Sequence, residues 1–413
     1  MLIRIRQTVM IGVVRDGMLS LKGIIFFLAC VLPAFPLNAQ DPARIYAEST
    51  DALYNLDFST AQRGYEALAR YSPDNPDYWN ALGSALWLEI MYDQQKLNIE
   101  SFSGSDSFGT RDSRDLVNPE DEKRLRETLA TAMSKAEVML KRNSNDIRAL
   151  YALGISNATL ASFEGSVKRS YLAAHGRART AKNLHLQVLK LDPTYDDARL
   201  SVGTYNYVIG VIPRFFRFLL APFGIRGEGK EAGIRQLETA AAKGKVASMD
   251  ASMVLGVVYV RERKYEQALR LLNELHSKYP RNFLFDLAIG SVYRRMKKWD
   301  ETIQTYQQIL AKIRAKQDGY ERLREARVYA ALGTARIDRM EFETAAEEFA
   351  RVVSSDDASP NERGNAYLWM GKIFDSKKER AKAVQQYDLL LRLDCDPRFK
   401  SEAQRYKRRA YGS

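Results

Sequence analysis

Hydrophobic and polar positions alternate along most of the chain with the three- and four-residue spacing of amphipathic helices. The spacing is most regular in the C-terminal half, where residues 252–272 (SMVLGVVYVRERKYEQALRLL) align with residues 286–306 (DLAIGSVYRRMKKWDETIQTY) at an offset of 34. The aligned pairs are Gly256 with Gly290, Tyr259 with Tyr293, Tyr265 with Trp299, Ala268 with Thr302 and Leu272 with Tyr306. A repeat of this length predicts helical hairpins that cover each other's apolar faces by stacking.

The repeat resembles the tetratricopeptide repeat, in which a first helix carries Leu-Gly after a large residue and a second helix carries a small residue and then an aromatic one. Trp79, Leu82 and Gly83 match the first-helix pattern, and Pro73 closes the unit before it. Other matches are Ala61 and Tyr65; Tyr329, Leu332, Gly333, Ala345 and Phe349; and Tyr367, Gly371, Ala383 and Tyr387. The resemblance implies an all-α solenoid, a right-handed superhelix of about seven hairpins.

The hairpins in the middle of the chain are predicted to be longer than the others. Gly154 and Ala181 are 27 residues apart, whereas the equivalent Gly256 and Ala268 are 12 apart. Residues 101–118, rich in Ser, Gly and Asp, are expected to form a mobile surface loop. The predicted parts are an N-terminal segment 1–39, hairpins over 40–97, degenerate units over 98–248, regular units over 249–397 and a basic capping helix over 398–413.

An apolar insert, YVIGVIPRFFRFLLAPFG at residues 207–224, interrupts the pattern. It is too short to span a bilayer, and its arginines and prolines oppose spanning. Three interpretations stay open: a segment lying in the headgroup region, a contact patch for a partner or apolar ligand, and an irregular part of the core. The side chains that would make a partner or membrane contact are Arg214, Phe215, Phe216, Arg217, Phe218 and Leu219.

A glycine-rich turn and the helix after it, with Gly233-Ile-Arg-Gln-Leu237, follow the insert. This part of the chain is similar to eukaryotic tetratricopeptide proteins of lipid-droplet and inclusion-body clearance. The resemblance implies a link to membranes or lipid.

The N-terminus has the pattern of a secretory signal peptide or an N-terminal anchor. Four cations precede an apolar run over residues 23–36, and Ala39 offers a small residue for cleavage. Removal of residues 1–39 would lower the net charge from +12 to +9 and leave Cys395 as the one cysteine. The pattern predicts export to the periplasm or cell envelope, and a fold held by packing rather than disulfides.

The search for catalytic and cofactor-binding motifs gives no indication that the protein is an enzyme. None of the three histidines lies in a zinc motif, and His185 occupies a position that repeats of this kind give to a large packing residue. The loop from Gly224 to Lys230 resembles a phosphate-binding loop, but Glu231 stands where Ser or Thr is needed. A weak anion site at this helix start, with Arg226 and Lys230, is the remaining expectation.

The sequence therefore predicts a non-catalytic, exported scaffold that binds a protein or peptide partner on a concave helical surface, with no cofactor, metal or nucleic acid. Candidate side chains on the first helices are Tyr259, Tyr293 and Arg294, of which the two tyrosines are better explained by packing. The alternative is a membrane- or lipid-associating module that acts through residues 208–223.

Overall fold

The computed structural model describes residues 41–97, 117–212 and 226–412. The chain divides into two compact units, Met1–Ile45 and Tyr46–Ser413. The described residues of the first unit, 41–45, begin helix α2. The predicted signal segment lies outside the described residues, and the fold described below is that of the second unit.

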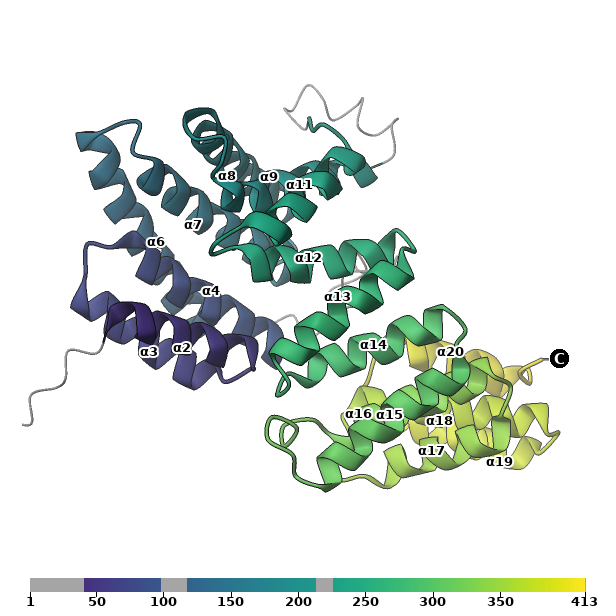
Figure 1. Ribbon diagram of the computed structural model, residues 1–413. Coiled ribbons are helices and arrows are strands. Elements are labelled where there is room, and N and C mark those ends of the chain that lie inside the picture. The colour runs from purple at the N-terminus through teal and green to yellow at the C-terminus, as the bar shows by residue number, and fades with distance from the viewer. Residues whose placement is uncertain (1–40, 98–116, 213–225, 413) are drawn as a thin grey trace, which may run out of the picture. The chain divides into compact units, whose positions relative to one another are not determined.

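The described residues form helices joined by short turns, and no strand occurs among them (Figure 1). Eight of these helices are the first members of hairpins: α2 (Pro42–Tyr54), α4 (Pro76–Asp93), α7 (Ile147–Ser166), α9 (Arg199–Val211), α12 (Ser248–Arg261), α14 (Phe283–Arg295), α16 (Glu325–Asp338) and α18 (Pro360–Ser376). Their partners are α3 (Phe58–Tyr71), α6 (Pro119–Arg142), α8 (Tyr171–Leu191), α11 (Lys230–Lys243), α13 (Tyr265–Lys278), α15 (Trp299–Arg314), α17 (Phe342–Ser354) and α19 (Arg380–Arg392). A short 3-10 helix, η3 (Asp196–Ala198), precedes α9, and α20 (Pro397–Arg408) packs against α18 and α19. The predicted all-α stack of tetratricopeptide hairpins is confirmed, with one hairpin more than expected.

Within a hairpin, a glycine of the first helix packs against a large side chain of the second. A β-carbon placed on Gly290 would lie 2.7 Å from the ring of Tyr306, and one on Gly371 would lie 2.3 Å from Tyr387. Gly333 has the same relation to Phe349. The repeat therefore conserves a contact: the missing β-carbon lets the ring of the second helix lie against the backbone of the first.

Seven of the eight first helices end in a turn whose key residue has a positive φ and is not glycine: Leu56, Gln95, Arg169, Arg263, Lys297, Met340 and Lys378. At the α12 end, the amide of Arg263 donates to the carbonyl of Val260, and that of Lys264 donates to the carbonyl of Tyr259. This left-handed cap satisfies the last carbonyls of the helix and reverses the chain for the second helix.

The lengthened central hairpins are also confirmed. Helices α7 and α8 have 20 and 21 residues, and α6 has 24, whereas α12 and α13 have 14 each. Helix α9 continues through Tyr207 into the apolar insert and ends at Val211. Residues 213–224 of the insert, and residues 101–116 of the predicted loop, lie outside the described residues.

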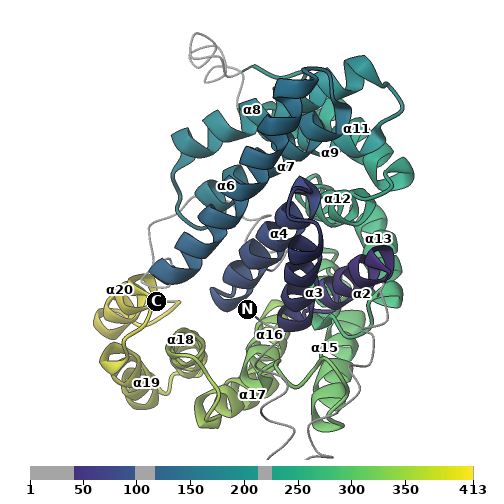
Figure 2. The same ribbon diagram turned by 90° about the vertical axis from the view of Figure 1, so that its left-hand side faces the viewer.

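The N-terminal hairpin, α2 with α3, lies beside α12, α13 and the start of α14 (Figures 1 and 2). Tyr54 belongs to the same core cluster as Leu255, Leu272 and Phe285, and its ring centroid lies 5.2 Å from that of Tyr279. The sequence pattern did not predict this return of the chain onto itself, because the contact joins hairpins that are not neighbours in the repeat.

Candidate functional site

The contact between the N-terminal hairpin and the later hairpins has a polar centre. The phenol of Tyr54 donates to a carboxylate oxygen of Asp250 at 2.9 Å. Asn282, which is 5% exposed, donates from its side-chain amide to the carbonyl of Tyr54 at 2.7 Å. The backbone amide of Arg281 donates to the side chain of Asn55 at 3.3 Å. These bonds fix the N-terminal hairpin in one register against α12 and the turn before α14.

Asp250 stands out electrostatically in this contact. Burial raises its pKa from 3.8 to about 6, and the hydrogen bond from Tyr54 acts in the opposite direction. Burial, together with the charge of Asp250 and the hydrogen bond to it, raises the pKa of Tyr54 well above 10. Asp250 therefore keeps the phenol of Tyr54 neutral, whereas burial, and not Tyr54, favours the neutral form of Asp250.

Helix α16 is fixed at both ends by ion pairs with neighbouring first helices. At its start, Arg324 donates two hydrogen bonds to the carboxylate of Glu362 on α18, at 2.6 and 3.0 Å. At its end, Asp338 pairs with Arg294 of α14 at 2.8 Å. The stretch between these pairs carries small, partly exposed side chains, among them Ala330 and Thr334. Helix α16 thus presents small side chains between two ion pairs.

A small pocket adjoins this row where the end of α4 meets the turn that leads into α16. Its lining includes Tyr92, Asp93, Phe283, Arg322 and Arg327. Burial raises the pKa of Asp93, and the nearby acidic groups Glu89 and Asp121 add to the shift, whereas Arg322 lowers it. Aromatic side chains and charges of both signs thus line the pocket together.

The predicted contact residues of the apolar insert, Arg214, Phe215, Phe216, Arg217, Phe218 and Leu219, lie outside the described residues. Of the predicted anion site, Arg226 is exposed, whereas Lys230 is engaged: its ammonium lies 2.6 Å from the carboxylate of Glu262. Glu262 also accepts a hydrogen bond of 3.1 Å from the phenol of Tyr207. A carboxylate from the next hairpin thus pairs with Lys230, and the anion site at Arg226 and Lys230 stays a prediction.

The predicted packing role of His185 is confirmed. Its side chain is fully buried, its ring stacks on that of Tyr151, and its Nε2 atom lies 3.1 Å from the Tyr151 carbonyl. A β-carbon on Gly154 would lie 2.1 Å from this nitrogen, so His185 occupies the position of Tyr306 and Phe349 in other hairpins. Burial lowers the pKa of His185 to about 4.

Among the first-helix candidates, Tyr259 is 8% exposed and donates to Glu238 at 2.9 Å, which makes it a packing residue. In the part of the chain that the structure describes, no three His, Cys, Asp or Glu side chains gather so as to hold a metal ion. Over residues 41–97, 117–212 and 226–412, each helix is too short or too polar to cross a membrane.

Comparison with protein families gives two matches. The tetratricopeptide repeat model matches residues 46–89, and the model described as Iml2/Tetratricopeptide repeat protein 39 matches residues 195–370. The second match includes the Gly233–Leu237 motif on which the similarity of the middle region was predicted. Among curated proteins, no significant match was found.

Several solved structures are similar to this chain at low identity. Yeast Tom70 is 14% identical with a TM-score of 0.37, over 90% of this chain and 89% of that one. A tetratricopeptide repeat protein from Parabacteroides merdae is 12% identical with a TM-score of 0.31, over 88% and 97%. The human IFIT1 dimer with m7Gppp-AAAA is 13% identical with a TM-score of 0.41, over 89% and 87%. At these TM-scores, nothing about the ligands or partners of this chain follows from the likeness.

Proposed function

Because the chain belongs to the tetratricopeptide repeat family, with an Iml2-like middle region, we propose that it is a non-catalytic scaffold that binds a protein or peptide partner. The binding surface that we propose is the row of first helices α14, α16 and α18. The observation that carries this choice is the pair of ion pairs, Arg324–Glu362 and Arg294–Asp338, that fix α16 between its neighbours. A fixed helix row loses little conformational entropy when a partner docks on it.

The side chains between the ion pairs support the same choice. Ala330 and Thr334 are small and partly exposed, so a partner backbone can approach the helix closely. The counterparts of Ala330 on α4 and α7 are less accessible: Asn80 is 4% exposed and Tyr151 is 8% exposed. We therefore place the close approach of a partner backbone on α16 rather than on α4 or α7.

A photo-crosslinking experiment tests this proposal. A benzophenone amino acid replaces Thr334 in one variant and Glu347, which is exposed on the second helix α17, in the other. We expect the variant with benzophenone at position 334 to form a specific cross-linked adduct with the partner, and unlabelled protein to abolish this adduct by competition. The variant with benzophenone at position 347 should form no adduct. Equal labelling at both positions, or none at either, would refute the first-helix surface.

Export of the chain is a further part of the proposal, and it rests on the signal-like pattern of residues 1–39. A fusion of residues 1–45 to a reporter enzyme that is active only outside the cytoplasm provides the test. We expect activity with the natural sequence and its loss when charges are placed in the apolar run 23–36.

The second candidate function is membrane association through residues 208–223. Its support is Val208 on α9, the first residue of this segment, which is 50% exposed, and Leu172 on α8, which is 85% exposed. Co-sedimentation with vesicles tests it, with Phe215, Phe216 and Phe218 changed to Ser in the control. We expect the natural chain to pellet and the triple variant to stay in solution; equal behaviour of the two would exclude the insert as the membrane contact.

A further inference from the structure

Helix α8 lies in a long stretch of sequence whose charged residues are all basic. Residues 165–191 include no Asp or Glu, and their cations are Lys168, Arg169, Arg177, Arg179, Lys182 and Lys190. Some of these are engaged: Lys168 pairs with Glu122 at 2.7 Å, and Arg177 donates to Asn157 at 3.2 Å. Among the described residues, neither Arg179 nor Lys182 has a carboxylate within ion-pair distance.

The two uncompensated cations lie around a buried aromatic residue of the next helix. The ammonium of Lys182 is 4.5 Å from the ring centroid of Tyr205, and the ring of His175 is 5.9 Å from that of Tyr205. Tyr205 is 5% exposed, yet its phenol oxygen has no hydrogen-bond partner among the described residues, and the buried Nε2 atom of His175 has none either. Two buried polar atoms without partners at one place call for a ligand, because each costs free energy when left unpaired.

The electrostatics of the cluster point the same way. Burial lowers the pKa of His175, and the charges of Arg179 and Lys182 lower it further. Burial and Arg179 also lower the pKa of Lys182, while Glu228 acts in the opposite direction. Burial raises the pKa of Tyr205, and the charge of Arg179 and the nearby backbone amide of Arg226 oppose this shift. That amide does not reach the geometry of a hydrogen bond to the phenol oxygen. The cations therefore repel one another, and a bound anion would relieve the repulsion.

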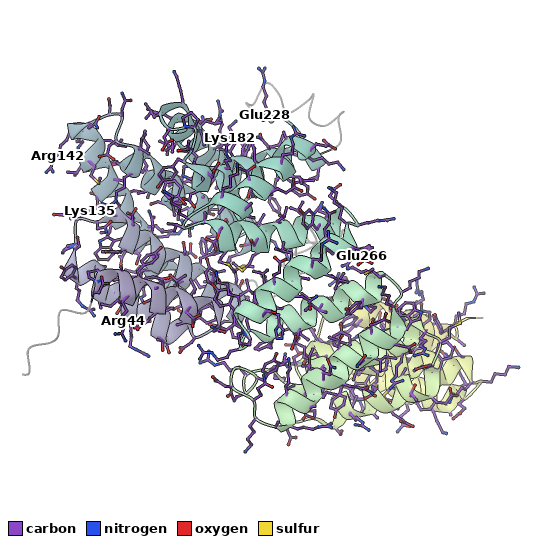
Figure 3. All side chains as sticks on the ribbon, viewed as in Figure 1. Arg44, Lys135, Arg142, Lys182, Glu228 and Glu266 are labelled. Atoms are coloured by element: carbon purple, nitrogen blue, oxygen red, sulfur yellow. The ribbon has the colours of Figure 1, made fainter. Side chains whose placement is uncertain are left out.

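One carboxylate belongs to this neighbourhood. Glu228 and Lys182 lie at the same edge of the molecule (Figure 3), where Glu228 is exposed and its backbone amide donates to Asn206 at 3.2 Å. The charge of Glu228 reduces the positive potential of the cluster but does not neutralise Lys182, since no ion pair forms between these two side chains.

We propose that His175, Arg179, Lys182 and Tyr205 form a binding site for a phosphate group. A guanidinium, an ammonium, a phenol and an imidazole offer donors from several directions, and phosphate has enough acceptor oxygens and charge to use them. A carboxylate has two oxygens and would leave part of the set unpaired. The site goes beyond the scaffold function and lies on different helices from the proposed partner surface. It also accounts for the predicted anion site: the backbone of Arg226 adjoins it, and the cations of α8 take the place of Lys230.

The experiment uses the imidazole as its own reporter. The full chain has three histidines, so the proton resonances of His175 can be assigned with a His175→Gln variant. The titration of His175 is followed by NMR in inorganic phosphate and in chloride at equal ionic strength. We expect phosphate to move the His175 midpoint to higher pH, because the anion favours the imidazolium form, and to leave the buried His185 unaffected.

Four variants separate the site from general charge effects. Lys182→Gln should weaken phosphate binding by about tenfold or more, whereas Lys190→Gln, which removes an exposed cation from the same helix, should leave it unchanged. Glu228→Gln should tighten binding. Tyr205→Phe should weaken binding while keeping the fold or stabilising it, because it removes a buried hydroxyl that lacks a partner. This last variant keeps the test valid even if a charge change disturbs folding.

Two further binding measurements distinguish a lipid headgroup from a free phosphate compound as the source of the phosphate group. Glycerol phosphate in solution and vesicles that contain phosphatidic acid in phosphatidylcholine are compared, each with the natural chain and Lys182→Gln. Tight, Lys182-dependent binding to the vesicles identifies a lipid headgroup, and binding to the soluble ester alone identifies a free phosphate compound. The proposal is overturned if His175 titrates alike in phosphate and chloride, if Lys190→Gln weakens binding as much as Lys182→Gln, or if polyglutamate binds and phosphate does not.

Discussion

Tyr54 donates a 2.9 Å hydrogen bond to Asp250 across 196 residues of sequence. The bond joins the last residue of α2 to the first turn of α12, and Asn282 holds the Tyr54 carbonyl from the other side at 2.7 Å. The N-terminal hairpin is therefore bound into the later hairpins by specific polar contacts as well as by apolar packing.

The stability of this contact should depend on pH. The pKa of Asp250 is about 6 in the folded chain and 3.8 as its ordinary value, so ionisation costs free energy only in the folded state. This group therefore leaves the fold undisturbed below pH 4 and destabilises it progressively as the pH rises through 6. Asp250→Asn should raise the free energy of unfolding by about 1–2 kcal/mol at pH 7.5, with allowance for partial exposure, and change it little at pH 4.

Denaturant unfolding at the two pH values measures the effect. Asp356→Asn removes an exposed carboxylate elsewhere and serves as the control. An equal gain for Asp250→Asn at both pH values would contradict the assignment of the effect to ionisation.

The Asn282 contact can be tested by a pair of substitutions. Asn282 caps α14 by accepting from the amide of Leu284 at 3.1 Å and donates to Tyr54. Asn282→Asp keeps the accepting oxygen but cannot donate when ionised, whereas Asn282→Ala loses both bonds. We expect Asn282→Asp to cost about 1–3 kcal/mol and Asn282→Ala to cost more. Hydrogen exchange should speed up in residues 46–71; unchanged exchange there would show that the bond does not hold the N-terminal hairpin.

The glycine contact provides a matched pair of alanine substitutions at equivalent repeat positions. At Gly290, a β-carbon would meet the Tyr306 ring at 2.7 Å, whereas at Gly256 the nearest side-chain atom, from Leu272, is 3.9 Å away. Gly290→Ala should destabilise the chain by about 1–3 kcal/mol through overpacking. Gly256→Ala should stabilise it by up to about 1 kcal/mol, because alanine has the higher helix propensity. Thermal unfolding of the two variants side by side gives the comparison, and a shift of the same sign in both would refute it.

The buried His185 should make the central hairpin sensitive to acid. The pKa of His185 is about 4 in the folded chain, and its ordinary value is 6.5. Between these two pH values, the imidazole is therefore protonated in the unfolded chain and neutral in the folded chain. The stability that this group contributes is complete above pH 6.5 and is lost as the pH falls towards 4, by on the order of 3 kcal/mol. His185→Phe supplies the kind of ring that Phe349 provides in its hairpin, and it should remove this loss.

Unfolding of both proteins between pH 7 and pH 4 checks this expectation. His276→Phe, at a half-buried histidine, is the control. If the His185→Phe protein loses stability on acidification as steeply as the natural chain, another group is responsible.

The repeat framework could be predicted because it rests on contacts within and between neighbouring hairpins. Gly154 and His185, for example, lie at fixed places in one unit, and the small and large residues alone indicate that they meet. The Tyr54–Asp250 bond could not be predicted, because it joins hairpins without a periodic relation, and Asp250 at a helix start has the pattern of an ordinary first-turn acid. The ion pair of Lys230 could not be predicted for a related reason: Glu262, its partner, belongs to the next hairpin.

The cluster on α8 likewise has one feature that the sequence shows and one that only the structure shows. The absence of acidic residues from 165–191 is visible in the sequence and is the signal that could have indicated the site. The unpartnered phenol of Tyr205 is not visible there, because a tyrosine in a first helix is most simply explained by packing. Three-dimensional structure was needed to place the α8 cations around it.

During synthesis, Tyr54 is made 196 residues before Asp250. At roughly 5–20 residues per second, the N-terminal hairpin would wait about 10–40 s for the surface on which it packs. In that interval its apolar side must be held by something else, such as a chaperone or a transient contact with the hairpins that follow directly. The long-range contact thus adds a slow, late step to the folding of an otherwise local repeat protein.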